Sequence, residues 1–492
     1  MTPAPAVTPA PPVAVPPALP APSGGGGGGT GAGGGGGGGT GAGGAGGTGA
    51  GGGGTGAGGA GGTPPPPPTF TVSGTVTGLL GTGLVLQDNA ADDLVVASNG
   101  SFTFTTPLAT GASYTVTVKS QSRILTRVCT VSSGSGTVAA AAVVDVVVTC
   151  AAPAARFAYV ANSGDNTVST YTLDATSGAL SPMVVPTVAT GSFPHPVAVD
   201  PTGRFAYVPN ADSGTVTGYT IDVTTGALTP MAVPSVPTSR PYSITVDPTG
   251  RFAYVANADN DPPKADNNTV SAFTVEAKTG ALSLIGTVAA GTNPQSVTVD
   301  PLGRFAYVAN YTSGNVSAYT IDAATGALSP MGVPTVTTGV NPTNVAVDPT
   351  GRFAYVANSS DHNVSAFTID QTTGALSPMA LPTVMTGTRP YQVAIDATGR
   401  FAYVSDAGAN SVLAFAIDAA GALSPLAVPT VVTGGAPYSI GVDPTGKFVY
   451  APSIDAGTVS AFTIDGTSGA LSPMVPPAVA AGGGALGIAF SR

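Results

Sequence analysis

Side chains suited to chemistry recur at two positions of a segment that repeats through the C-terminal part of this 492-residue chain. The first position carries a histidine, tyrosines and other residues: His195, Tyr242, Gln295, Thr343, Tyr391, Tyr438 and Leu486. The second position, two residues earlier, carries Phe193, Arg240, Asn293, Asn341, Arg389, Ala436 and Gly484. Variation at fixed places in an otherwise uniform repeat indicates a surface that contacts a ligand or a partner.

Three of these residues have the chemistry that opening a lactone demands. His195 could act as a general base on water, while Arg240 or Arg389 stabilises the developing oxyanion. Because no acidic residue occupies either position, the two arginines favour an anionic ligand. The candidate ligand-binding residues are Tyr242, Asn293, Gln295, Asn341, Tyr391 and Tyr438. In the alternative, structural interpretation, both arginines are solvated or stacked on Tyr242 and Tyr391.

These positions belong to a unit of about 48 residues, a period typical of solenoids, propellers and arrays. Its core is an Arg-Phe-Ala-Tyr-Val-Ala-Asn-like segment that begins at Arg156, Arg204, Arg251, Arg304, Arg352, Arg400 and Lys447. Four strand signals recur in each unit, and in the second unit they cover residues 196–200, 204–208, 215–222 and a short stretch at 227–231. Four strands per unit predict one blade of a β-propeller.

The ends of the array predict how the ring closes. The array opens at Arg156 without a preceding inner strand and ends with an inner-strand signal at residues 486–490. We expect this last strand to complete the first blade, so that no open sheet edge remains at the seam. The predicted fold is therefore all-β, with a seven-bladed propeller of four-stranded blades over residues 152–492. Arg240 and Arg389 then stand three blades apart and face each other across the channel mouth.

Two further regions precede the propeller. Residues 1–68 form a low-complexity tail rich in Pro, Ala and Gly, which is predicted to be disordered. Residues 69–151 contain short alternating strands separated by Gly, Asn and Ser turns, a pattern typical of a small antiparallel β-sandwich. Cys129 and Cys150 lie in this region, and we expect them to form a disulfide rather than remain as buried thiols.

A disulfide would place the protein in an extracytoplasmic compartment, namely the periplasm, the cell surface or the exterior. No signal peptide is visible in the chain. The net charge of −10, with 8% charged residues and no basic cluster, excludes nucleic acid as a partner. No apolar run approaches the length of a transmembrane helix. No cofactor or metal is predicted, although Asp259, Asp261 and Asp266 of one longer loop could offer oxygen ligands to calcium.

The array also resembles a known family. The segment Tyr-Val-Ala-Asn at residues 159–162, 254–257, 307–310 and 355–358 is similar to the Tyr-Val-Thr-Asn signature of one group of propeller repeats. The whole array resembles the seven-bladed lactonase family, which includes 6-phosphogluconolactonase and the carboxymuconate cyclases. This resemblance implies a propeller fold and a possible hydrolase activity on lactones.

The family's site motifs are matched in part. Pro194, His195, Val208 and Pro209 match the motif of the active blade, whereas Gly214 and Thr215 stand in place of its Asp-Arg pair. The family's Gly-Pro-Arg-His motif appears here as residues 387–391, with Tyr391 in place of the histidine. The strands from residue 99 to Cys150 resemble a module of bacterial envelope proteins and lipoproteins, which implies envelope attachment through the N-terminal region.

The sequence leaves three functions open. The first is an exported or cell-envelope propeller that binds a small anionic ligand or a protein partner on its loop face. The second is a hydrolase of an anionic sugar lactone or a muconate-type lactone. The third is a structural surface-layer component.

Overall fold

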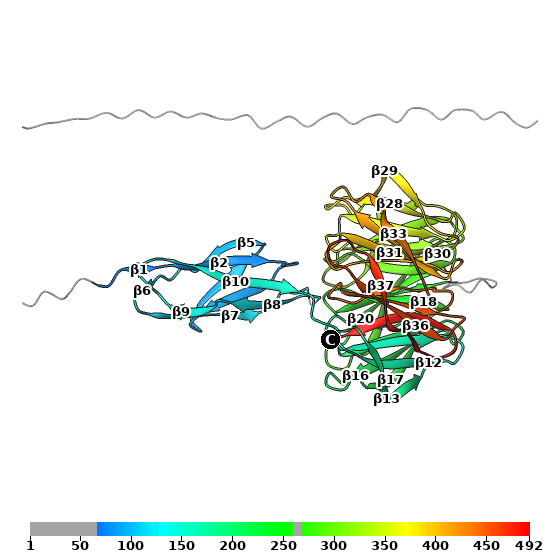
Figure 1. Ribbon diagram of the computed structural model, residues 1–492, viewed down its shortest axis with the longest axis horizontal. Coiled ribbons are helices and arrows are strands. Elements are labelled where there is room, and N and C mark those ends of the chain that lie inside the picture. Colours follow the sequence, from blue (N-terminus) through cyan, green and yellow to red (C-terminus); the bar gives the residue numbers. More distant parts are fainter. Residues whose placement is uncertain (1–65, 125, 259–267) are drawn as a thin grey trace, which may run out of the picture. The chain divides into compact units, whose positions relative to one another are not determined.

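The computed structural model describes residues 66–124, 126–258 and 268–492, and the regular elements in these ranges are all β-strands (Figure 1). The predicted tail, up to residue 65, and the aspartates at 259, 261 and 266 lie outside the described residues. Within the described part of the chain, no helix is long and apolar enough to cross a membrane.

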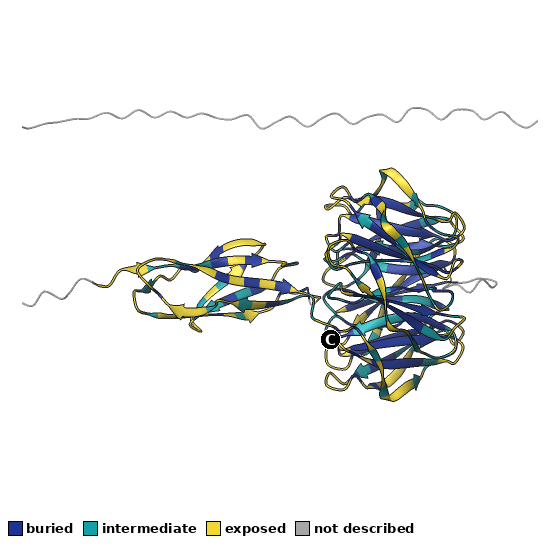
Figure 2. Ribbon diagram, in the orientation of Figure 1, coloured by how far each residue is buried: buried dark blue, intermediate teal, exposed yellow. Residues whose placement is uncertain are grey.

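The first region folds as a β-sandwich. One sheet has the order β5 (Gly100–Thr103), β2 (Val72–Thr77), β10 (Val143–Ala151) and β8 (Val128–Ser132). The other has the order β4 (Asp92–Val96), β3 (Leu84–Asp88), β7 (Ser113–Ser120) and β9 (Ser135–Thr137), and β1 (Thr69–Phe70) pairs with β6 (Leu108–Ala109). Alternate side chains of both sheets form one core, as Figure 2 shows by their burial.

The prediction of an all-antiparallel sandwich was wrong for one pair of strands. β10 runs parallel to β2, with Val147 opposite Thr75, while it is antiparallel to β8 on its other side. A parallel pair needs a long connection rather than a hairpin, and the chain between β2 and β10 supplies it by building the second sheet.

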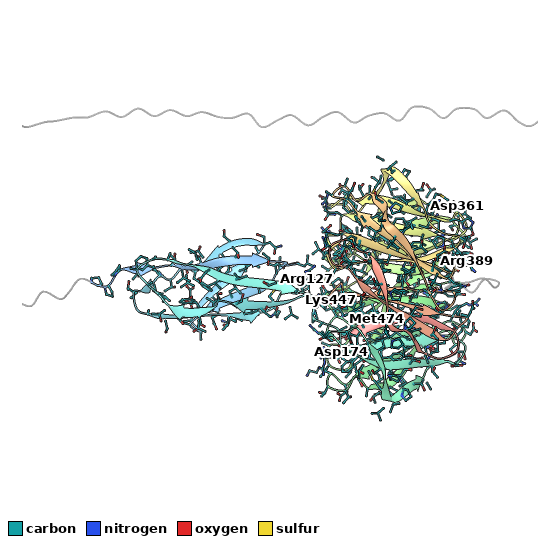
Figure 3. The ribbon with its side chains drawn as sticks, in the orientation of Figure 1. Arg127, Asp174, Asp361, Arg389, Lys447 and Met474 are labelled. Atoms are coloured by element: carbon teal, nitrogen blue, oxygen red, sulfur yellow. A yellow bond between two sulfur atoms is a disulfide. The ribbon has the colours of Figure 1, made fainter. Side chains whose placement is uncertain are left out.

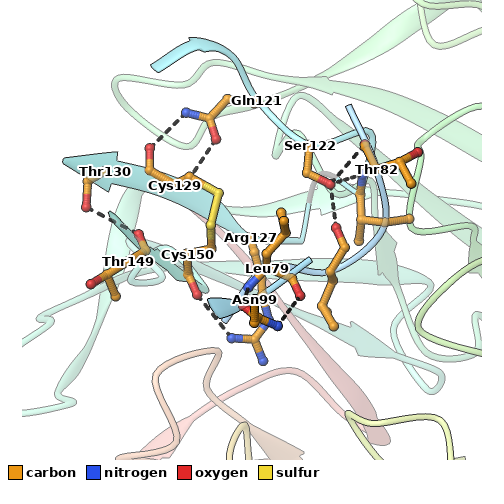
Figure 4. The surroundings of a disulfide bond; sticks show 12 residues. Leu79, Thr82, Asn99, Gln121, Ser122, Arg127, Cys129, Thr130, Thr149 and Cys150 are labelled. Carbon is orange, nitrogen blue, oxygen red and sulfur yellow. Dashed lines mark hydrogen bonds between the residues drawn. A yellow bond between two sulfur atoms is a disulfide. The ribbon is translucent and has the colours of Figure 1, made fainter. Parts of the chain in front are cut away.

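The disulfide predicted from the two cysteines is confirmed. Cys129 of β8 and Cys150 of β10 lie directly opposite each other in the ladder and are covalently joined (Figure 4). Both are 2% exposed. The Gln121 side chain donates to the Cys129 carbonyl at 2.9 Å and accepts from its N–H at 2.8 Å. The disulfide therefore joins two neighbouring strands inside the sheet.

The second region forms seven four-stranded antiparallel sheets, the blades, which confirms the predicted propeller. From the inner strand outward, blade 1 is β38 (Ala485–Ser491), β11 (Phe157–Asn162), β12 (Thr167–Leu173) and β13 (Leu180–Ala189), and blade 2 is β14 (Ala198–Val199), β15 (Phe205–Asn210), β16 (Thr215–Ile221) and β17 (Leu228–Pro237). Blade 3 is β18 (Pro241–Val246), β19 (Phe252–Asn257), β20 (Thr269–Val275) and β21 (Leu282–Ala289), and blade 4 is β22 (Pro294–Val299), β23 (Phe305–Asn310), β24 (Asn315–Ile321) and β25 (Leu328–Thr337).

The remaining blades follow the same order. Blade 5 is β26 (Pro342–Val347), β27 (Phe353–Asn358), β28 (Asn363–Ile369) and β29 (Leu376–Met385). Blade 6 is β30 (Pro390–Ile395), β31 (Phe401–Asp406), β32 (Ser411–Ile417) and β33 (Leu423–Val432), and blade 7 is β34 (Gly441–Val442), β35 (Phe448–Ser453), β36 (Thr458–Ile464) and β37 (Leu471–Ala480). The fourth strand, predicted as a short stretch of five residues, has ten residues in six blades.

The ring closes through its last strand, as predicted. β38 pairs antiparallel with β11, so that Ala489 lies opposite Tyr159 and Ser491 opposite Phe157. Blade 1 is thus built from both ends of the propeller sequence. No unpaired inner edge is left at the seam between these described strands.

The repeated core segment couples neighbouring blades. Its tyrosine is fully buried in every blade and donates a hydrogen bond to a glycine carbonyl of the next blade, for example Tyr307 to Gly374 at 2.7 Å and Tyr450 to Gly178 at 2.6 Å. The other five bonds run from Tyr159, Tyr207, Tyr254, Tyr355 and Tyr403. Seven such bonds, one across each blade interface, explain why this tyrosine never varies within the array.

The other residues of the core segment act across the same interface. Gly374 has a φ of 75°, and a Cβ there would lie 2.5 Å from the Phe305 ring of the preceding blade. Arg304 stacks on that ring at 4.8 Å and donates to the Gln371 carbonyl of the next blade. Phe305 and Tyr307 pack against the slim Ala354 and Val356 of blade 5, which is the expected packing of a bulky face on a slim one.

Candidate functional site

The seven variable side chains at the start of the inner strands converge on one central cavity. His195, Tyr242, Gln295, Thr343, Tyr391, Tyr438 and Leu486 all line a cavity of about 240 Å³. Each comes from a different blade, because each lies at or just before the start of a first strand and the first strands surround the axis. The sequence thus correctly identified a set of residues that lie far apart in the chain and close together in the fold.

One side of the cavity is formed by an aromatic cluster with an arginine on it. The His195 ring of blade 2 packs on the Tyr242 ring of blade 3, with 4.2 Å between centroids, and Phe193 contacts His195 edge-on at 5.5 Å. The guanidinium of Arg240 lies 5.7 Å from the centre of the Tyr242 ring. Arg240 also forms an exposed ion pair of 3.7 Å with Asp212, so its charge is partly compensated.

A second cluster of the same kind is formed by blades 6 and 7. The Tyr391 and Tyr438 rings lie 4.5 Å apart, and the guanidinium of Arg389 lies 5.2 Å from the centre of the Tyr438 ring. Arg389 donates to the Tyr438 hydroxyl at 3.0 Å. Its guanidinium forms no ion pair with any described residue. In the alternative interpretation Tyr391 was the stacking partner; the structure instead places Arg389 on the tyrosine of the next blade.

His195 is uncharged at physiological pH. Burial, assisted by the positive charge of Arg240, lowers the pKa of His195 to about 3. Its Nε2 is inaccessible to solvent and makes no hydrogen bond to the described residues. His195 is held in place through its backbone N–H, which donates to the Pro209 carbonyl at 2.8 Å. The imidazole is therefore a neutral group with an unused polar atom at the cavity wall.

Polar side chains that the sequence analysis did not select complete the lining. They follow the variable position by one residue and are Ser243, Ser296, Asn344, Gln392 and Ser439. Four of them link neighbouring inner strands by accepting a backbone hydrogen bond, for example Asn344 Oδ1 from Val393 N–H at 3.2 Å and Gln392 Oε1 from Ile440 N–H at 3.2 Å. The amide Nδ2 of Asn344 and Nε2 of Gln392 bond to no described residue and remain available to a ligand. The sequence pattern that could have identified these five residues is a polar residue at the start of an otherwise apolar strand.

The residues of the second variable position shape the loops instead of lining the cavity. Phe193, Arg240, Asn293 and Asn341 have φ values between 39° and 60°, in the left-handed region. Asn293 is 3% exposed and its Oδ1 accepts from Gln295 at 2.7 Å. Asn341 donates to the Tyr311 carbonyl and accepts from Ser360. Neither of the two asparagines proposed as ligand-binding residues is among the residues that line the cavity.

Two arginines stack on aromatic residues that line the cavity, and the lining carries no acid. None of the described residues that line it is an aspartate or a glutamate. Figure 3 shows Arg389 on the same face of the propeller as Asp361, while Lys447 lies toward the opposite face. Burial and the nearby Tyr438 raise the pKa of Tyr391, so this tyrosine stays neutral as well.

The family of the chain follows from its sequence as well as its geometry. The family model described as "Lactonase, 7-bladed beta-propeller" matches residues 112–241, 234–339, 332–390 and 378–485. The chain belongs to this lactonase family. Among curated proteins, no sequence matches this member.

Solved structures share the fold of this lactonase-family member. The Pseudomonas aeruginosa periplasmic gluconolactonase is 22% identical, with a TM-score of 0.59, and the match covers 68% of this chain and 99% of that one. A putative 6-phosphogluconolactonase from Bacteroides fragilis is 18% identical, with a TM-score of 0.60 and coverage of 68% and 98%. Another from Bacteroides uniformis is 18% identical, with a TM-score of 0.59 and coverage of 69% and 100%.

Proposed function

We propose that this lactonase-family propeller binds a small sugar acid or sugar lactone in its central cavity, outside the cytoplasm. One observation supports this most directly: seven blades contribute to a single cavity that is bordered by two arginine-capped aromatic clusters and has no carboxylate in its lining. A ligand with one negative group and several hydroxyls matches that arrangement.

Each part of such a ligand has a counterpart. The guanidinium of Arg389, which forms no ion pair among the described residues, suits a carboxylate or phosphate. The aromatic rings of Tyr391 and Tyr242 offer flat apolar surfaces to a sugar ring. The amide donors of Asn344 and Gln392 can bind its hydroxyls.

The proposed compartment rests on two observations. Cys129 and Cys150 form a disulfide, and disulfides persist in oxidising compartments. One of the solved structures with this fold is a periplasmic protein by its description. The periplasm, the cell surface and the exterior all agree with these observations, and attachment to the envelope stays a proposal.

Hydrolysis of the bound lactone is the second candidate function. Family membership favours it, as do the descriptions of the solved structures as gluconolactonases. Among the lining residues, His195 is the one side chain with a basic nitrogen, and it is uncharged near neutral pH. With a pKa of about 3 it is a weak base, and Nε2 must become exposed before it can activate water. Binding therefore agrees with the geometry better than catalysis does.

Isothermal titration calorimetry with gluconate and 6-phosphogluconate tests the proposal. We expect binding by the wild type and a loss of about tenfold in affinity, or about 1.4 kcal/mol, for Arg389→Gln. Arg352→Gln is the matched control, because Arg352 stacks on Phe353 in a turn at the other end of an inner strand. Equal weakening by both variants, or no heat with either ligand at millimolar concentration, would contradict the proposal.

Glucono-δ-lactone separates the two candidate functions. The lactone opens spontaneously, so the measured quantity is the rate of acid release above that of buffer. A wild-type acceleration that disappears in His195→Ala, with gluconate affinity retained, would establish hydrolysis. An unchanged rate in both proteins, together with gluconate binding, would leave the protein as a binding module.

A further inference from the structure

The outer edge of the propeller is protected in six of its seven blades. The fourth strand of each of these blades has a proline opposite the aromatic residue of the third strand, for example Pro182 opposite Tyr171 and Pro330 opposite Tyr319. The equivalent prolines of the other four are Pro230, Pro378, Pro425 and Pro473. Each of these strands also contains at least one further proline.

Proline at this position prevents a further strand from pairing. An edge strand exposes a row of N–H and C=O groups that can bind another β-strand, and proline removes an N–H from that row. Proline in an edge strand is accommodated where its nitrogen points away from the neighbouring strand. The six prolines therefore remove an outward donor from each of six edges.

Blade 3 breaks this pattern. Its outer strand β21 has eight residues, Leu-Ser-Leu-Ile-Gly-Thr-Val-Ala, and contains no proline. Leu284 lies opposite Phe273, at the position that proline occupies elsewhere, and its side chain is 62% exposed. The ladder between β20 and β21 is interrupted only at Ile285, whereas in blade 1 four residues, 183–186, lie opposite Thr170. β21 is thus a shorter, more regular edge with its donor intact.

The charges around β21 also differ from those of the other blades. β21 itself carries no charged residue. The loop before it contains Glu276 and Lys278, whose charges cancel, whereas the corresponding loops of the other six blades carry one aspartate and no cation: Asp174, Asp222, Asp322, Asp370, Asp418 and Asp465. Two copies of a chain with a net charge of −10 repel each other in general. β21 itself adds no charge to that repulsion.

We propose that β21 is a self-association edge, through which two copies of this chain pair their blade 3 sheets. The two β21 strands would lie antiparallel about a twofold axis and join two four-stranded sheets into one of eight strands. Identical uncharged edges are self-complementary in this arrangement. One pair of eight-residue strands buries less surface than the roughly 1,200 Å² of a stable complex, so the dimer is weak and depends on concentration.

Sedimentation velocity on the full chain tests this inference, over a range from about 1 μM to several hundred μM that spans the affinity of weak complexes. We expect the wild type to shift from monomer toward dimer across this range. Leu284→Pro should stay monomeric, and six blades show that the fold accommodates proline there. Leu284→Thr keeps the backbone N–H and the β-propensity, and should still dimerise.

Each alternative outcome overturns the inference. A wild type that stays monomeric at every concentration has no such edge, and a Leu284→Pro variant that dimerises like the wild type associates elsewhere. Loss of the dimer in a folded Leu284→Thr variant would assign the contact to the leucine side chain instead of the backbone. Hydrogen exchange of the wild type gives a test without substitution, because the β21 amides should gain protection as concentration rises, and an unchanged rate would refute the pairing.

Discussion

Removing the hydroxyl of Tyr307 should destabilise the propeller more than removing the hydroxyl of Tyr319, although the two side chains are about equally buried. Tyr307 and Tyr319 are both in blade 4, and both side chains are at most 2% exposed. The Tyr307 hydroxyl donates to the carbonyl of Gly374 at 2.7 Å, and the Tyr319 hydroxyl donates to the carbonyl of Ala289 at 2.6 Å. The two bonds differ in the environment of the acceptor.

The environment of the acceptor carbonyl determines how much stability each substitution costs. The bond of Tyr307 is buried, so Tyr307→Phe leaves a carbonyl with no access to water, which costs about 1–3 kcal/mol. The bond of Tyr319 reaches Ala289, an exposed residue at the end of β21, where water can replace the hydroxyl. Tyr319→Phe should therefore cost about 0.5 kcal/mol, at the low end for a hydrogen bond. Blades 3, 5, 6 and 7 carry phenylalanine at the position of Tyr319, whereas all seven blades carry tyrosine at the position of Tyr307.

Equilibrium urea unfolding of both variants, followed by far-UV circular dichroism, measures the difference. The same atom is removed from the same blade in each, so effects of Tyr→Phe on the unfolded chain cancel in the comparison. We expect Tyr307→Phe to lower the free energy of unfolding by about 1 kcal/mol more than Tyr319→Phe does. Equal losses, or a greater loss for Tyr319→Phe, would refute the argument that the buried acceptor of its hydrogen bond is what keeps the tyrosine in every repeat.

Three further predictions concern His195 and the seam of the ring. Because burial lowers the pKa of His195 to about 3, its ring signals in NMR spectra should not shift between pH 5 and pH 8, and a titration near pH 6.5 would contradict the buried site. The unfolded chain binds this proton below pH 6.5 and the folded chain does not, so His195 should reduce stability as pH falls from 6.5 toward 3, an effect that His195→Gln removes. Deleting residues 485–492 removes β38 and should abolish the cooperative unfolding of the propeller. Placing these residues directly before Arg156 should restore cooperative unfolding. A stable truncated protein would show that closure by β38 is dispensable.

The repeat made the ring and the cavity lining predictable, whereas the fourth strands and one strand pairing were not. Sequence spacing alone located the seven variable residues, because each lies at or just before the start of a first strand and the closed ring brings these strands to one axis. The length of the fourth strand was underestimated because its prolines resemble loop signals. An edge strand tolerates proline on its unpaired side, so this composition does not end the strand. The parallel pairing of β2 with β10 depends on contacts between distant segments, which local alternation does not encode.

The site residues differed in predictability for a related reason. A side chain's position on a repeat can be deduced from spacing, but its partner depends on the neighbouring blade. Arg389 therefore lies beside a lining residue, but that residue is Tyr438 of blade 7, on which its guanidinium stacks. In the same way, His195 was identified as a candidate, while its low pKa follows from burial and from Arg240 of the next blade, which spacing alone does not reveal.

The blade that carries Arg389 also departs from the repeat at the signature asparagine, and the two departures are physically linked. In blade 4 the asparagine Nδ2 of Asn310 donates to Ser317 in the third strand. Blade 6 has Asp406 there, which as a carboxylate can only accept, and it binds the backbone N–H groups of Thr388 and Arg389, each at 2.8 Å. Arg389 is thereby held outside the left-handed conformation that its counterpart Arg240 adopts. A change at one structural position thus gives the backbone N–H of Arg389 its partner, so structural and ligand-facing positions cannot be assigned independently in this propeller.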